Sequence, residues 1–260
     1  MPIIEFLEQS APVFFPKSDY KIVKYLDLTK FMSLIQNNSL FFCRLDKLED
    51  KFEGTTSRPN REARINYLQN IAKSNYLDIP LSDEDILSKV DDNYELERSL
   101  KPLTCVNCWN KNVNESAALW KIYSSFTNGI MLKSSIKKLK KSLESTVEEI
   151  QLSEIKYLNY SIDMMPDGNT NYPVIHKHVC YSYEEEIRLI FMKNPEFGFF
   201  YDWNKEKIQE GQNLKVDLDI MIDEIIISPY APNWFFELVK DISYNYKLDK
   251  PIKKSELSFE

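Results

Sequence analysis

The segment 181–191, Tyr-Ser-Tyr-Glu-Glu-Glu-Ile-Arg-Leu-Ile-Phe, constrains the fold more than any other part of this chain. Side chains alternate along an extended strand, so Glu184, Glu186 and Arg188 share one face while the aliphatic residues share the other. Because an unpaired buried charge is too costly to keep, Arg188 is expected to hold one carboxylate and to leave the other poised. The alternation fits two structures equally well: a strand that lines a polar cleft, and an edge strand with one solvated face.

Length and composition are those of an ordinary globular chain. The 260 residues are 43% hydrophobic and 28% charged, which is enough chain for a substantial core, and we expect a single domain over residues 1–260. No stretch approaches the ~18 consecutive apolar residues that span a bilayer. The N-terminus lacks the basic segment and apolar core of a secretion signal. The four cysteines are few and scattered, so a reduced, cytoplasmic location without membrane contact is expected.

The charge balance argues against a strong nucleic-acid surface. The net charge is −7 and the pI is about 5.2, whereas phosphate backbones need a clustered positive field. The dense basic run 133–141 is typical of an amphipathic helix whose lysines are solvated, although a phosphate contact stays open there. The chain has only 5 glycines and no glycine-rich phosphate loop.

Apolar periodicity predicts an α+β fold with mixed, mostly antiparallel sheets, because strands and helices alternate without the βαβ rhythm of a parallel sheet. A charged helical insert is expected at about 58–101, with its first helix over 61–76 and its second helix capped by Ser82, and a C-terminal helix is expected at about 232–246. The other expected helices are 28–36, 114–123 and 133–141. The expected strands are 40–44, 104–109, 130–132, 150–157, 176–181, 187–192, 214–218 and 224–227.

Three patterns in the sequence are compatible with a metal site. Cys105 and Cys108 have CxxC spacing, but residues i and i+3 of a strand point to opposite faces, which favours packing thiols. His176 and His178 share one face of a strand without a fixed carboxylate partner. The acidic turn 46–54 lacks the spacing of a calcium loop, but it follows a strand, where functional loops tend to lie.

Large aromatic side chains form a separate pattern. Trp109, Trp120 and Tyr123 fit two roles, packing in the core or forming a wall on which a flat ring such as adenine or nicotinamide stacks.

An ordered series of short elements resembles a known family. The elements are Lys24-Tyr25-Leu26, Ser39–Arg44, Phe52-Glu53-Gly54, Cys108-Trp109, Glu115–Tyr123, Gly129-Ile130, Tyr183–Arg188 and Asp223–Ile227. Their order, and above all the Tyr-Glu-x-Glu-x-Arg element, resembles the bacterial domain-of-unknown-function family 2971 over roughly residues 22 to 230. The chain departs from that family at Tyr181, where a tryptophan is usual, and at 49–52, where Asn-Asp-Pro-Phe is common.

The layout is also similar to the ADP-ribosyltransferase fold, in which a glutamate on a late strand stabilises the charge that develops as a glycosidic bond breaks. This similarity implies Glu186 as the catalytic carboxylate, with Glu184 or Arg188 fixing its orientation. It implies NAD as a substrate and no permanently bound cofactor. The binding residues implied in this way are Lys24, Tyr25, Arg44, Trp109, Trp120, Tyr123 and Tyr183.

Three functions therefore follow as hypotheses. The leading one is an NAD-consuming or ADP-ribosyl-transferring enzyme that acts on a nucleotide-like small molecule, in bacterial conflict or phage defence as the distribution of the family implies. The second is a metal-dependent nuclease, in which the acidic turn and Glu184 and Glu186 gather magnesium, although no basic groove accompanies them. The third is a non-catalytic sensor or partner-binding module, in which the Glu/Arg strand is a structural ion network.

Overall fold

The computed structural model describes residues 3, 14–74, 81–112, 114–124, 127–193 and 208–258. The strands are β1 (Lys21–Asp27), β2 (Ser39–Arg44), β3 (Thr104–Asn110), β4 (Gly129–Ser135), β5 (Gln151–Glu154), β6 (Lys156–Leu158), β7 (His176–His178), β8 (Glu186–Met192), β9 (Gly211–Lys215), β10 (Glu224–Ile227) and β11 (Ile252–Lys254). The helices are α1 (Leu28–Asn37), α2 (Arg58–Lys73), α3 (Asp83–Leu100), α4 (Ala117–Tyr123), α5 (Ile136–Ser142), α6 (Leu218–Met221) and α7 (Asn233–Asn245). Short 3₁₀ helices are η2 (Leu45–Lys47), η3 (Lys101–Leu103), η4 (Tyr172–Val174) and η5 (Val179–Glu184).

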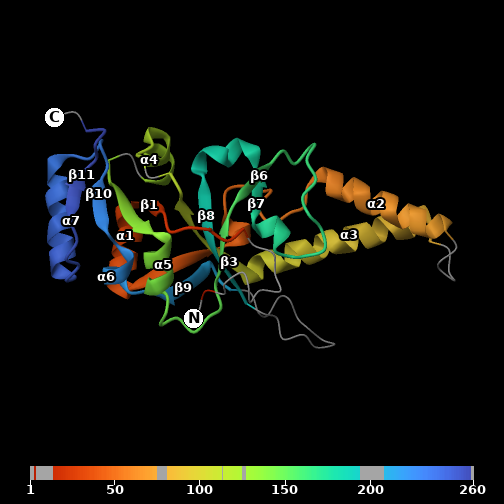
Figure 1. Cartoon of the computed structure of the whole chain (residues 1–260), viewed down its shortest axis with the longest axis horizontal. Coiled ribbons are helices and arrows are strands. Elements are labelled where there is room, and N and C mark those ends of the chain that lie inside the picture. Colours follow the sequence, from red (N-terminus) through yellow and green to blue (C-terminus); the bar gives the residue numbers. More distant parts are fainter. Residues whose placement is uncertain are drawn as a thin grey trace.

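Most of the strands form one 9-stranded sheet with the path β11-β10-β4-β1-β3-β2-β9, while β8 pairs with both β3 and β5. The pairs within it are antiparallel except β10–β11, and β6 and β7 form a separate parallel pair. Helices α1, α5, α6 and α7 lie around the end of the molecule that contains β10 and β11 (Figure 1). The predicted α+β class with a mixed, mostly antiparallel sheet is confirmed.

Helix α1 connects β1 to β2 and covers the start of the site. Its N-cap is Asp27, whose Oδ1 accepts a hydrogen bond from the Lys30 amide, and it ends at Asn38 in the left-handed conformation. Phe31, Leu34 and Ile35 face the core. The remaining side of the helix is free to border the cavity described below.

The two helices expected between residues 58 and 101 are α2 and α3, and they project from the sheet as a hairpin (Figure 1). Ser82 caps α3 as predicted and forms a capping box with Asp85. The basic run 133–141 forms α5 only from Ile136 onward, with Ile136 and Leu139 buried; the predicted start at 133 is wrong, because residues 133–135 end β4. Helix α7 occupies the predicted C-terminal position. Residues 75 and 76 of the first predicted insert helix, and most of the N-terminal segment, lie outside the described residues.

The strand predicted over 176–181 and the continuous extended run expected from Glu184 to Arg188 both differ from the structure. The strand predicted over 176–181 ends at His178, and Val179–Glu184 forms η5 instead. The ring Nδ1 of His178 accepts the Cys180 amide, which caps the 3₁₀ turn and stops the strand. At the other end, Glu185 has a φ of 42° and reverses the chain, so β8 begins only at Glu186.

In the described part of the chain, no helix combines the length and apolarity needed to cross a lipid bilayer.

Candidate functional site

A cavity of about 490 Å³ lies where the sheet is split. On one edge β3 pairs with β8 along its whole length, from Thr104 to Asn110. On the other edge β1 reaches only Asn110, and β2 reaches only Cys105 and Val106. The middle of β3 therefore has no strand partner on that edge, and β1, α1 and β2 surround the resulting opening.

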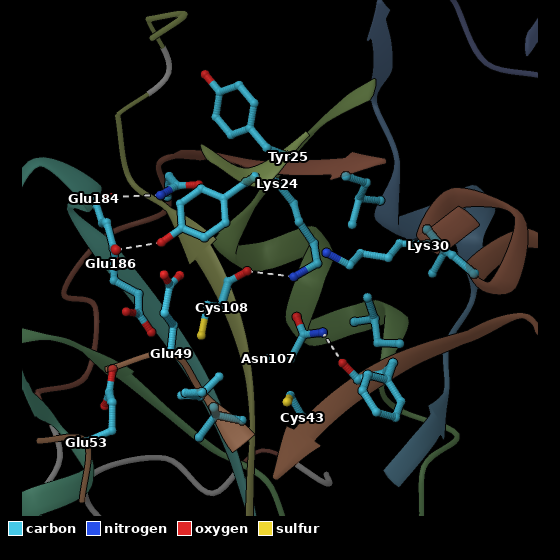
Figure 2. A pocket seen from close by; sticks show the side chains of 18 of the residues that line it. Lys24, Tyr25, Lys30, Cys43, Glu49, Glu53, Asn107, Cys108, Glu184 and Glu186 are labelled. Atoms are coloured by element: carbon cyan, nitrogen blue, oxygen red, sulfur yellow. Dashed lines mark hydrogen bonds between the residues drawn. The ribbon is translucent and has the colours of Figure 1, made fainter. Parts of the chain in front are cut away.

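Two polar side chains bridge this split in place of ladder hydrogen bonds. The Nζ of Lys24 donates to the Cys108 carbonyl oxygen at 2.7 Å, and the Nδ2 of Asn107 donates to the Phe41 carbonyl oxygen at 2.8 Å (Figure 2). Buried backbone carbonyls need such partners. The split is thus a stabilised feature of the sheet.

Carboxylates gather on one side of the cavity, which we call the carboxylate end: Glu49, Asp50, Glu53, Glu184 and Glu186. Figure 2 shows the four glutamates of this set on the side of the cavity opposite Lys24 and Lys30, which form the lysine end. The cavity is therefore polarised along its length.

Arg188 organises the carboxylate end from beneath, with a side chain that is 0% exposed. Its Nε and Nη2 donate to the two oxygens of Glu186 at 2.6 and 3.0 Å. Its Nη1 and Nη2 donate to the two oxygens of Glu53 at 2.9 and 3.1 Å, and Nη1 also donates to the Val174 carbonyl at 2.7 Å. These contacts use all of the donors of a guanidinium, so Glu186 and Glu53 are held in fixed positions.

Lys177 links the second carboxylate to this network. Its Nζ lies 2.7 Å from Glu184 Oε2 and 3.3 Å from oxygens of both Glu186 and Glu53. The hydroxyl of Tyr123 donates to the other oxygen of Glu184 at 2.5 Å. Glu184 and Glu186 therefore lie side by side, joined through one ammonium group.

The two carboxyl groups have opposite protonation tendencies. Burial raises the pKa of Glu184, and the neighbouring charge of Glu186 adds to this shift against the opposing pull of Lys177. Burial would also raise the pKa of Glu186, but the charges of Arg188 and Lys177 outweigh it and lower that pKa to about 2. Near neutral pH, Glu186 is thus a fixed carboxylate, whereas Glu184 takes up a proton more readily than an ordinary glutamate.

The lysine end has an amine with unusual properties. Burial lowers the pKa of Lys24 to about 8, and the charge of Lys30 contributes to the shift. Lys30 lies on the first turn of α1 and also borders the cavity. Two cations on one wall are suited to an anionic group such as a phosphate.

The structure brings together five of the residues proposed from the sequence. Those that border the cavity are Lys24, Tyr25, Tyr123, Glu184 and Glu186. Tyr25 contributes mainly by packing, because its hydroxyl accepts the Ser116 amide and its ring meets Trp120 edge to face. The prediction that Arg188 holds one carboxylate is confirmed, but Arg188 lies behind the cavity wall and also holds Glu53.

Four of the expected binding residues do not border the cavity. Trp109 and Trp120 are fully buried, and their ring N–H groups donate hydrogen bonds to Asn107 and Glu115 respectively. Arg44 forms an ion pair with Asp46 and donates to main-chain carbonyls of residues 208 and 209. Tyr183 is 46% exposed on η5. The expectations that Trp109 and Trp120 form a stacking wall and that Arg44 and Tyr183 are binding residues are therefore not met by this cavity.

Lys177 and Glu53 are the main site residues that sequence reasoning missed. Alternation along a strand that puts His176 and His178 on one face puts Lys177 on the opposite face. This alternation is the one sequence signal that could have identified Lys177 as a site residue. His176 is instead buried, with its Nδ1 2.7 Å from the Tyr172 carbonyl oxygen. Glu53 lies 135 positions from Arg188 along the chain, and no local pattern reports that contact.

The metal hypotheses find little support. Within the described residues, no cluster of three or more histidine, cysteine or acidic side chains is arranged to hold an ion. Cys105 belongs to the main core while Cys108 borders the cavity, so the two thiols point apart as expected. Burial raises the pKa of Cys108, which keeps it a thiol. The acidic turn instead directs Glu53 to Arg188 and Lys177.

A scan against known family models finds no match for this chain, and a search of the curated proteins finds none either. The resemblance to family 2971 stays a prediction.

Proposed function

We propose that this protein is an enzyme that breaks the N-glycosidic bond of an NAD-like nucleotide and transfers the ADP-ribosyl group to water or to an acceptor hydroxyl. One observation carries the proposal: Glu184 and Glu186 lie side by side in the cavity wall with pKa values shifted in opposite directions. Such divergence is typical of carboxyl pairs that divide the work of catalysis.

The reaction needs two different carboxylates. The bond between the ribose C1′ and the nicotinamide nitrogen breaks, and its electron pair neutralises the ring nitrogen, which leaves without being protonated. Positive charge develops at C1′ and the ribose oxygen, and the fixed carboxylate of Glu186 stabilises it. The acceptor oxygen then attacks C1′ and gives its proton to Glu184, whose raised pKa suits a general base.

The polarity of the cavity supports a nucleotide as the ligand. A pyrophosphate is suited to the lysine end, because Lys24 and Lys30 are the cations there. The ribose and its departing base are suited to the carboxylate end, where positive charge develops. A volume of about 490 Å³ is typical of small-molecule sites, which range over ~300–1,000 Å³.

The test is nicotinamide release from NAD by the purified protein, followed by chromatography. Glu184→Gln should lower the rate by about 10²-fold or more, because the amide cannot accept the proton. Glu185→Gln is the matched control, since Glu185 is exposed between the two candidates and should leave the rate unchanged. Full activity in a folded Glu184→Gln variant would refute the proposal.

The sensor hypothesis has its own signature in the same experiment. A wild-type protein that NAD stabilises against heat, but that releases no nicotinamide, would favour a non-catalytic nucleotide sensor. The proposal places the enzyme in the cytoplasm and gives it a part in bacterial conflict or phage defence.

A further inference from the structure

One carboxylate oxygen at the carboxylate end has no partner. Asp50 borders the cavity, yet its side chain is among the buried ones, and the residue is only 8% exposed. Its Oδ1 accepts the Phe52 amide at 2.9 Å. Within the described residues, Oδ2 is buried without any hydrogen-bond partner.

A buried carboxylate oxygen without a hydrogen-bond donor destabilises the fold, because its desolvation is not compensated. The neighbouring acids do not share this condition. Both oxygens of Glu53 are bonded to Arg188, and both oxygens of Glu184 have donors in Tyr123 and Lys177. Among these acids, Asp50 therefore stands out as the one with a buried acceptor oxygen left for a ligand.

The position of Asp50 connects it to the proposed reaction centre. Asp50 shares the acidic turn with Glu53, whose amide donates to the Asp50 carbonyl oxygen at 3.2 Å and whose carboxylate lies 3.3 Å from Lys177 Nζ. The same Nζ lies 2.7 Å from Glu184 Oε2 and 4.7 Å from the centre of the Tyr181 ring. Asp50, Tyr181 and Glu184 thus all border the cavity at the carboxylate end.

We propose that Asp50 recognises the departing base by accepting a hydrogen bond from its carboxamide N–H, so that the enzyme selects a base that carries this donor. The inference rests on the proposed function. The base must lie next to the ribose carbon that Glu184 and Glu186 serve, and a cationic pyridinium ring is suited to a wall rich in carboxylates. Tyr181 provides a flat ring face beside it.

Three dinucleotides separate the contributions to recognition. NAD carries a carboxamide, its 3-acetylpyridine analogue carries a methyl ketone of similar shape without the N–H, and its nicotinic acid analogue carries a carboxylate. A site built around a hydrogen bond discriminates strongly against a partner that lacks it. We expect the wild-type protein to prefer NAD in kcat/KM by at least about 10-fold over the ketone and by more over the acid, which Asp50 repels.

The decisive variant is Asp50→Asn. Oδ1 remains to accept the Phe52 amide, so the substituted nitrogen takes the place of Oδ2 and presents a donor. The preference for NAD over the nicotinic acid analogue should fall by at least about 10-fold relative to wild type. Asp50→Ser is the second variant, because its hydroxyl can accept from the same amide while leaving the cavity side empty. The Asp50→Ser variant should act on the three dinucleotides with similar kcat/KM values.

Asp46→Asn is the matched control, since Asp46 is exposed in the same acidic turn, does not border the cavity, and its substitution makes the same chemical change without touching Asp50. Comparing ratios between variant and wild type cancels the intrinsic reactivity of each analogue. Unchanged ratios in both folded Asp50 variants would overturn the inference while leaving the proposed function intact. If wild type releases no base from any dinucleotide, the proposed function falls and this inference falls with it.

Discussion

Arg188 compensates the buried carboxylates of Glu53 and Glu186, and replacing it with methionine tests this role. The substitution keeps a long side chain but removes the guanidinium that holds Glu186 and Glu53. Three buried carboxylates, those of Glu53, Glu184 and Glu186, would then face Lys177 as their one cation within the described network. Removing one partner of a buried ion pair costs about 3–5 kcal/mol, because the other charge is left uncompensated.

The loss is measurable by urea unfolding or by thermal melting. For a chain of this size each kcal/mol corresponds to a shift of about 2–4 °C, so the melting temperature should fall by about 6–20 °C. Arg98→Met is the control. Arg98 pairs with Glu95 at 2.7 Å, but the two side chains are 70% and 67% exposed, so the loss should stay below about 1 kcal/mol.

The pH dependence gives a second test of the same reasoning. The folded-state pKa of Glu186 is lowered to about 2, so its ion pairs stabilise the fold above its ordinary pKa, and this stabilisation is lost as the pH falls from about 4.5 toward 2. The gap in unfolding free energy between wild type and Arg188→Met should therefore narrow over that window. A loss below about 1 kcal/mol at pH 7, or a gap that does not depend on pH, would refute the claim that Arg188 compensates buried carboxylates.

Two further predictions concern the lysine end and the acidic turn. Burial lowers the pKa of Lys24 to about 8, so Lys24 loses its positive charge and the binding of ADP-ribose should weaken as the pH rises from 7 to 9. Lys24→Met should abolish this pH dependence, whereas Lys21→Met, on an exposed part of the same strand, should keep it. Isothermal titration calorimetry at several pH values measures the binding. Gly54 has a φ of 69°, and a Cβ added there would lie 2.6 Å from Leu45 Cδ2. Gly54→Ala should therefore lower the free energy of unfolding, measured in urea, by about 1–3 kcal/mol. An unchanged unfolding midpoint would contradict the need for glycine at this position.

Local sequence patterns predicted most of the elements because the patterns are themselves the physical cause. The apolar spacing of 28–36 predicted α1, and the acids after Ser82 predicted the start of α3. The strand β1 and the short β11 were not among the strands predicted from periodicity. The separation of Cys105 from Cys108 followed from alternation along β3.

The pairing of Glu184 with Glu186 was predicted for an incomplete reason. Alternation along one strand placed both on a single face, but Glu184 belongs to η5, and the reversal at Glu185 separates it from β8. The two side chains meet because Lys177 binds both. Alternation holds from Glu186 onward, which is why its contact with Arg188 was foreseen. Contacts between distant segments leave no periodic trace, so Glu53 could not be found in this way.

The same guanidinium connects the two roles assigned to the carboxylate end. Arg188 fixes Glu186, the charge-stabilising group, and through Glu53 it also fixes the turn that presents Asp50. A substitution at Arg188 should therefore disturb both the rate of base release and the choice of base, whereas Glu184→Gln should lower the rate alone. If the rate and the preference respond independently to Arg188→Met, the turn is held by other contacts, and the ion network serves only the reaction.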